Sequence, residues 1–326
     1  MSLPYTLRLL CLCGASFFMI HAALAVAAQL SAGTAMRVAE RLKPSSAARL
    51  LFGLRMLPFT LTLLAVLAFC IPSYLWLEPE ATGEKVGLVC FLAALLGVAI
   101  WTLAIVRVVH AVRSTARYLH RCERHGKQIE MPGETTPALL LKDRSPVLAV
   151  AGVVHPRLVI SRRVMRGLTA EQIDVALRHE RAHRASGDNL KRFLILLAPD
   201  VLPFLRGFVT LEQRWAKAIE WAADDQASAG DPRRALSLAD ALVKVAKMGS
   251  KPQLSYLSSS LMADDHDLSE RVDRLLRPQP IAEKPAKQLI PLISGAGALM
   301  GASLMIVVLW PASLSMVHQA LEQLVR

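Results

Sequence analysis

Residues 169–189 read TAEQIDVALRHERAHRASGDN. Thr169 followed by Gln172 is the capping-box pattern that starts a helix, and Gly187 is the residue type that commonly ends one. The helix between them carries two histidines four residues apart. Residues at i and i+4 lie on the same helix face, so both imidazoles can reach one point in space. This stretch therefore predicts a helix that presents a histidine pair.

The pair belongs to the pattern His-Glu-x-x-His, formed by His179, Glu180 and His183. Two imidazole nitrogens on one helix face can bind the same zinc ion, and the glutamate beside them suits a general base. Zinc also lowers the pKa of bound water to near 7, which makes hydroxide available at neutral pH. Because the pattern also occurs by chance on ordinary helices, the hypothesis needs a third ligand.

A second helix is expected to supply that ligand. It opens with a capping-box pattern at Thr210 and ends at Gly230. Glu220 lies in an apolar stripe of this helix, where an unpaired carboxylate would be costly, so we predict that it is the third ligand. Asp224 lies one turn further and is expected to accept the second ring N–H of a ligand histidine. The alternative is that both residues are ordinary surface acids.

Three further residues are weaker candidates for the same site. Asp188 is expected to steady the site, although it also suits the N-cap of the following helix. Hydrolysis requires a group that stabilises the oxyanion, and His266 and Arg271 are candidates, against the alternatives of a loop histidine and a surface arginine. We expect an edge strand at residues 147–154 to bind the substrate as an added strand.

The composition points to a membrane. The 326-residue chain is 53% hydrophobic, with a mean hydropathy of +0.38. A bilayer core requires about 20 apolar residues as helix. Stretches of at least that length without Asp, Glu, Lys or Arg occur at residues 9–36, 56–77, 86–106 and 289–317.

Charged residues between these stretches indicate the orientation. The connector at 78–85 is acidic, whereas the first connector and the segment after residue 106 are basic. The positive-inside rule then places the basic regions in the cytoplasm and both termini outside, in a bacterial-type inner membrane. The alternative is a signal peptide cleaved near residues 25–27, which the charge pattern opposes. The basic residues of the first connector are Arg37, Arg41, Lys43, Arg49 and Arg55.

The net charge of +12 does not indicate nucleic-acid binding, because the basic residues gather at the ends of the spans. The lipid bilayer is the expected partner of these charges. The five cysteines show neither a disulfide framework nor a cysteine zinc pattern. A G-x-x-x-G pattern at 297–301 permits close helix packing, which we assign to packing within the chain, with homo-oligomers through the spans left open.

Four regions follow from these features: three spans (1–106), a basic juxtamembrane helix and linker (107–136), a protease domain (137–280) and a fourth span with a short tail (281–326). Val- and Leu-rich runs cut by Pro and Gly at 137–161 indicate a few strands. Residues 193–209, between the two predicted ligand helices, are apolar but too short to span, so we expect them to lie against the membrane interface.

The motifs resemble those of one family. HERAHRASGDNL, from His179 to Leu190, is similar to the zinc motif of the BlaR/MecR-type membrane metallopeptidases, and Glu220 with Asp224 is similar to the family's E-x-x-x-D. The resemblance covers residues 146–277. It implies a mainly α polytopic membrane protein, with four transmembrane helices and an α+β gluzincin-type domain inserted between spans three and four. It also implies one Zn²⁺ per chain, held by His179, His183 and Glu220.

Well-known members of this family sense β-lactams and trigger cleavage of a cytoplasmic repressor, so the expected partner is a protein substrate, either such a repressor or the chain itself. Nine residues follow Val317, and a penicillin-binding sensor domain does not fit there. A sister group, the HtpX and CAAX-protease type, usually has Gly in place of Ala182; it would imply quality control of membrane proteins. The remaining alternative is a non-catalytic membrane receptor or scaffold.

Overall fold

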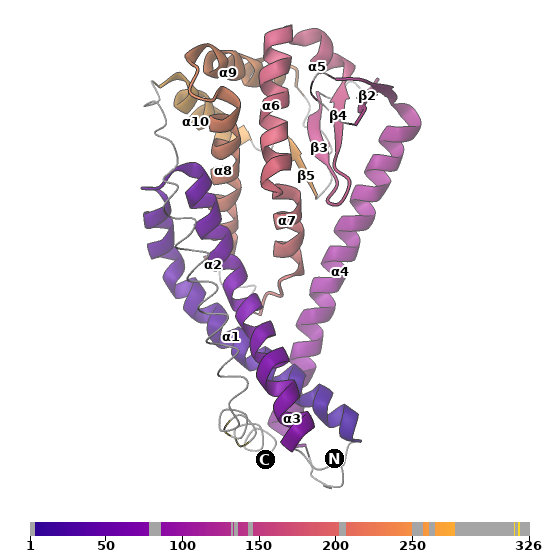
Figure 1. Ribbon diagram of the computed structural model, residues 1–326, viewed down its shortest axis with the longest axis vertical. Coiled ribbons are helices and arrows are strands. Elements are labelled where there is room, and N and C mark those ends of the chain that lie inside the picture. Colours follow the sequence, from indigo (N-terminus) through magenta and orange to yellow (C-terminus); the bar gives the residue numbers. More distant parts are fainter. Residues whose placement is uncertain are drawn as a thin grey trace.

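The computed structural model describes residues 4–77, 86–131, 133, 136–142, 146–201, 207–249, 257–260, 265–277, 316 and 319. In this part of the chain the protein is mainly helical and has one small sheet, which confirms the mainly α character of the predicted fold class. Long helices form one end of the molecule, and the sheet with shorter helices forms the other (Figure 1).

Three of the described helices are long and apolar enough to cross a membrane. Their most apolar windows have mean hydropathies of 2.2, 2.1 and 2.6. Helices of 34–38 residues are about 50–57 Å long at 1.5 Å per residue, so each extends well beyond a hydrocarbon core of about 30 Å. They are α1 (Tyr5–Ala39), the continuous run of α2 (Pro44–Ala65), η1 (Val66–Cys70) and α3 (Ile71–Leu77), and α4 (Leu88–His125).

The first three predicted spans lie within these helices, whereas almost all of 289–317 lies outside the described residues.

The predicted first connector was too long. Pro44 occupies the first turn of α2, so the connector contains only residues 40–43, and Arg49 and Arg55 are helical. Arg55 is buried at 1% exposure, which a loop residue of a connector would not be.

The basic segment that follows the third span continues the same helix, as predicted. α4 ends at His125, where the Gly126 N–H donates to the Cys122 carbonyl. Within the predicted helix and linker of 107–136, the helical part therefore ends at residue 125, and a strand begins at Lys127.

A five-stranded sheet forms the other end of the molecule, in the order β1-β2-β4-β3-β5. β2 and β4 pair in parallel, and the other neighbouring strands are antiparallel. The strands predicted within 137–161 are thereby confirmed. The bounds are β1 (Lys127–Ile129), β2 (Ala138–Leu141), β3 (Leu148–Ala151), β4 (Arg157–Ser161) and β5 (Ser258–Ser260).

Shorter helices cover the sheet and connect it to the spans. The capping box at Thr169 forms as predicted, and Asp231 caps the helix after it with Pro232 in its first turn. Thr210 does not cap a helix, because α8 already begins at Gly207. The bounds are α5 (Arg162–Gly167), α6 (Ala170–Ser186), α7 (Asp188–Leu197), α8 (Gly207–Ser228), α9 (Pro232–Lys247) and α10 (Asp265–Leu276).

α8 joins the two ends of the molecule through its packing. Leu211, Trp215 and Ile219 belong to the apolar core that the spans form, whereas Ala227 belongs to the core between the sheet, α6 and α9. Burial of these side chains is the main stabilising term for such a helix. Glu220 therefore lies where the membrane bundle meets the sheet-bearing region.

Candidate metal centre

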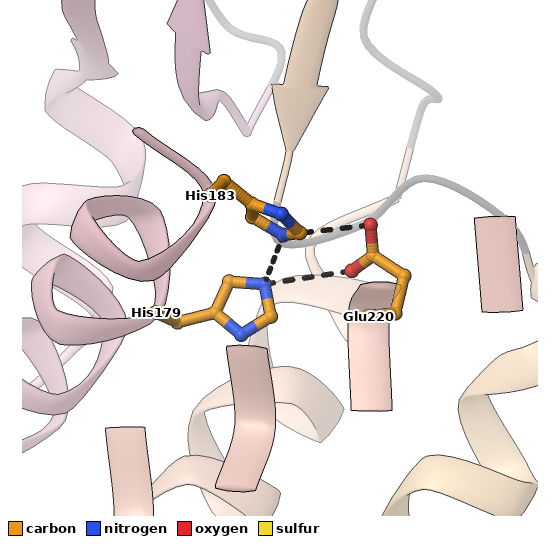
Figure 2. A group of neighbouring side chains, drawn as sticks. All are labelled: His179, His183 and Glu220. Carbon is orange, nitrogen blue, oxygen red and sulfur yellow. Dashed lines mark hydrogen bonds and ion pairs between the residues drawn. The ribbon is translucent and has the colours of Figure 1, made fainter. Parts of the chain in front are cut away.

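The predicted histidine pair lies on α6 with its side chains facing α8. His179 and His183 are buried at 0% and 1% exposure, and Glu220 on α8 at 5%. The two Nε2 atoms are 3.1 Å apart. Glu220 Oε2 lies 3.4 Å from His179 Nε2, and Glu220 Oε1 lies 3.5 Å from His183 Nε2. Figure 2 shows the two rings and the carboxylate converging on one point.

The outer nitrogens of both rings are held by carboxylates. Asp224 Oδ1 lies 2.9 Å from His179 Nδ1, and Asp188 Oδ2 lies 2.8 Å from His183 Nδ1. An Nδ1–H that donates to a carboxylate leaves the lone pair on Nε2, facing the centre of the cluster. Asp188 is not the N-cap of α7: that position is Gly187, and Asp188 is the first helical residue.

Arg271 on α10 is not a surface arginine, because it is buried against the acids that surround the histidines, and its predicted oxyanion role is still a prediction. Its Nε and Nη2 donate to Asp224 at 2.9 and 2.7 Å, and its Nη1 lies 3.2 Å from Glu220 Oε2. The side chain is buried at 4% exposure, between two acids one turn apart on α8. The guanidinium is thus bound to carboxylates on several of its donor atoms, and it neutralises and positions the acids that surround the histidines.

Carboxylates dominate the electrostatics of the cluster. Burial favours the neutral form of His183, but Glu220 and Asp188 outweigh burial and raise its pKa to about 10. Burial also favours neutral Asp224, but Arg271 and His179 outweigh it and lower the pKa to about 2. The carboxylates that stabilise a proton on the imidazole would equally stabilise a metal cation between the Nε2 atoms.

The donor set fits a divalent metal ion of the zinc type. The ligand atoms that His179, His183 and Glu220 offer all lie within 4.8 Å of one another. Both carboxylate oxygens of Glu220 are buried and accept no hydrogen bond from the described residues. Two imidazoles and one carboxylate are a common ligand set for catalytic zinc, which also leaves one position open.

Glu180 lies beside this cluster at 1% exposure. Its Oε2 accepts a hydrogen bond from the Val150 N–H at 3.2 Å, and its Oε1 has no hydrogen-bond partner among the described residues. Burial raises the pKa of Glu180 to about 7, against the opposing effect of the two histidines. A carboxylate with this pKa can both accept and return a proton near neutral pH.

The predicted edge strand is not an edge. β3 lies between β4 and β5, with Val150 opposite Ser259. The prediction failed because the pairing strand comes more than a hundred residues later. Asn189, to which the sequence analysis assigned no role, also holds β3 in place: its Nδ2 donates to the carbonyls of Val150 and Gly152 at 3.1 and 2.9 Å. Its place next to Asp188 was the available signal.

His266 is the second residue of α10, and its side chain lies outside what the structure describes. Its predicted oxyanion role is therefore still a prediction.

Comparison with known proteins agrees with this geometry. A search of curated proteins found no match. A family model described as BlaR1 peptidase M56 matches residues 54–275, from α2 to α10, which is more than half of the 326-residue chain. The matched region contains His179, His183 and Glu220 as well as α4. On this evidence the chain belongs to the BlaR1 peptidase M56 family of membrane metallopeptidases.

Proposed function

We propose that the chain is a membrane-embedded zinc endopeptidase that cleaves a cytoplasmic or juxtamembrane protein as part of regulated signalling. The observation that carries the proposal is the enclosed cluster of His179, His183 and Glu220, with a further carboxylate behind each imidazole. Membership of the peptidase family supports it independently.

In this proposal the two histidines and Glu220 hold the zinc ion. Zinc held there supplies Lewis acidity for attack on a peptide carbonyl. Asp224 and Asp188 fix the imidazole tautomers, and Arg271 holds Asp224 and Glu220 in place.

Glu180 acts as the general base and acid. Its Oε1 accepts a proton from the attacking water and then delivers that proton to the nitrogen of the leaving amine, which balances the hydrolysis. Burial raises the pKa of Glu180 above the usual carboxyl range and so favours uptake of the proton, whereas a zinc ion held beside it would lower that pKa again.

We further propose that the protease region is inserted between the third and a fourth span and faces the cytoplasm, with both termini outside. The support is the excess of Lys and Arg after residue 106 and the apolar, charge-free stretch at 289–317. The substrate is then a protein that reaches the inner membrane surface, such as a transcriptional repressor or the chain itself.

The first test compares protein N-termini across the proteome in cells expressing the wild type or Glu180→Gln. We expect new N-termini only with the wild type, and about one zinc per chain in both proteins. His183→Ala is expected to lose zinc. Zinc-free wild type, prepared without chelator, would contradict the zinc site. Identical N-termini from two folded, zinc-loaded proteins would contradict proteolysis under those conditions and favour a receptor or scaffold.

A further inference from the structure

Residues 198–200, which follow α7, contact all three described spans. The lower end of α7 in Figure 1 reaches down between α2 and α4. There, His21 of α1 lies with its Nε2 2.9 Å from the Pro199 carbonyl oxygen. Arg107 of α4 lies with its Nη2 3.4 Å from the Ala198 carbonyl oxygen.

The Asp200 carboxylate bridges two spans. Its Oδ1 accepts from Nη2 of Arg55 on α2 at 2.9 Å, and its Oδ2 accepts from Nη1 of Arg107 on α4 at 2.9 Å. One carboxylate can satisfy both arginines only while α2 and α4 keep their present separation. A change in that separation larger than the arginine side chains can follow therefore breaks one of the two ion pairs or moves Asp200.

The same cluster reaches both helices of the metal centre. α7 follows α6 directly through Gly187, and α6 carries both histidines. Arg55 also donates through Nε to Glu212 on α8 at 2.6 Å, and its Cζ lies 4.7 Å from the centre of the Phe208 ring. Glu212 lies eight residues, or about 12 Å of helix, before Glu220.

We propose that Asp200 is a positioning residue through which the relative placement of α2 and α4 controls the geometry of the metal centre. The inference rests on the proposed function for the identity of the metal. A coupling of this kind requires two sites and a structural element that connects them. Here the two sites are the α2–α4 contact at Asp200 and the metal centre, and residues 198–200 together with α8 connect them.

The two ion pairs of Asp200 differ in how readily they can be released. The Arg55 side chain is 2% exposed, whereas the Arg107 side chain is 39% exposed. Breaking a buried ion pair leaves an uncompensated charge in the protein interior, whereas water solvates an exposed arginine once its ion pair is broken. The Arg107 contact is therefore the one expected to open when α4 moves, while Arg55 keeps Asp200 attached to α8.

The test uses the full chain in lipid nanodiscs and the variants Arg107→Gln and Arg113→Gln. Arg113 is an exposed residue of α4 and provides the matched control, because its loss removes the same charge from the same helix. We expect Arg107→Gln to weaken zinc binding roughly fivefold or more, a typical allosteric coupling, and to speed amide hydrogen exchange in residues 188–201. Arg113→Gln should change neither quantity.

Two further variants sharpen the test. Arg107→Lys retains the charge and should restore most of the protection against exchange. In an Asp200→Asn background, the effect of Arg107→Gln should be much smaller than in the wild type, because the ion pair is already lost and only the 3.4 Å contact with the Ala198 carbonyl oxygen remains to be removed. Equal zinc affinity and equal exchange in Arg107→Gln and Arg113→Gln would overturn the coupling. If the wild type binds no zinc, the proposed function fails, and the exchange measurements alone decide the coupling.

Discussion

Two clusters in this molecule are built from the same parts and differ in their access to water. In each, one buried arginine binds two carboxylates, and at least one of the acids comes from α8. The metal-centre cluster consists of Arg271, Asp224 and Glu220, and the boundary cluster consists of Arg55, Asp200 and Glu212.

The arginine side chains are 4% and 2% exposed, so they do not distinguish the clusters. The acids do. The side chains of Asp224 and Glu220 are 1% and 7% exposed, whereas those of Asp200 and Glu212 are 27% and 36% exposed. Enclosed carboxylates depend on the guanidinium for their charge balance, while the partly hydrated ones retain water as an alternative partner. We therefore expect the exposure of the acids to determine how much each arginine contributes to the free energy of unfolding.

The largest effect is expected for Arg271→Met. It removes the guanidinium from two buried carboxylates, and breaking a buried ion pair costs about 3–5 kcal/mol of the free energy of unfolding. Urea unfolding of zinc-free protein in nanodiscs, followed by tryptophan fluorescence, measures it, since Trp215 and Trp221 lie on α8. The control is Arg274→Met on the same helix, whose side chain is 24% exposed. Equal losses of unfolding free energy in the two variants would contradict the idea that enclosure of the carboxylates determines the contribution of the arginine.

A smaller loss, about 2 kcal/mol, is expected for Arg55→Met. The methionine keeps much of the buried volume, and water can solvate the freed acids, so less than the full cost of a broken buried pair applies. The same unfolding measurement tests it. If Arg55→Met cost as much as Arg271→Met, acid exposure would not be the deciding variable.

The ion pair of Asp188 is intermediate between the two clusters, because its acid is enclosed but its cation is partly exposed. This acid is 3% exposed, but its cation, Lys191, is 26% exposed and lies 3.0 Å away. Asp188 also keeps its contact with His183, so Lys191→Met is expected to cost about 1 kcal/mol. A loss above that of Arg55→Met, measured by urea unfolding under the same conditions, would contradict this order.

The smallest effect is expected for Arg178→Gln. Arg178 pairs with Asp174 one turn earlier on α6, and the two side chains are 40% and 50% exposed. Such a surface pair contributes about 0.3–0.5 kcal/mol. The urea midpoint of the Arg178→Gln variant should barely differ from that of the wild type. A clear loss of unfolding free energy would show that position on the ligand helix matters more than exposure.

The predictions from sequence succeeded where the signal is local. The i, i+4 spacing of His179 and His183 and the capping box at Thr169 each act within one or two helical turns, and both are confirmed as structural features. The apolar stretches likewise predicted three of the helices that are long enough to span a membrane, because helices of soluble proteins rarely remain free of charged residues over such a length.

The predictions failed where a partner is distant in the chain. Arg55 was read as a connector residue, since its carboxylates come 145 and 157 residues later. The alternative that Arg271 is a surface arginine was wrong, because nothing near it in sequence indicates that it binds Asp224, 47 residues earlier. The pairing of β5 with β3 was missed for the same reason. Residue type and spacing identify candidates, but only tertiary packing selects their partners.

The distance in sequence between Arg55 and its carboxylates also has a consequence for biosynthesis. At synthesis rates of about 5–20 residues per second, the 145 residues that separate Arg55 from Asp200 require roughly 7–30 s. During that time α2 can enter the bilayer, while its arginine has neither carboxylate partner. A charge inside the hydrocarbon is costly, so the nascent helix must hold Arg55 at the lipid–water boundary until α7 and α8 emerge from the ribosome. Arg55 therefore gains both of its carboxylate partners only after Glu212, on the second helix of the metal centre, has been made.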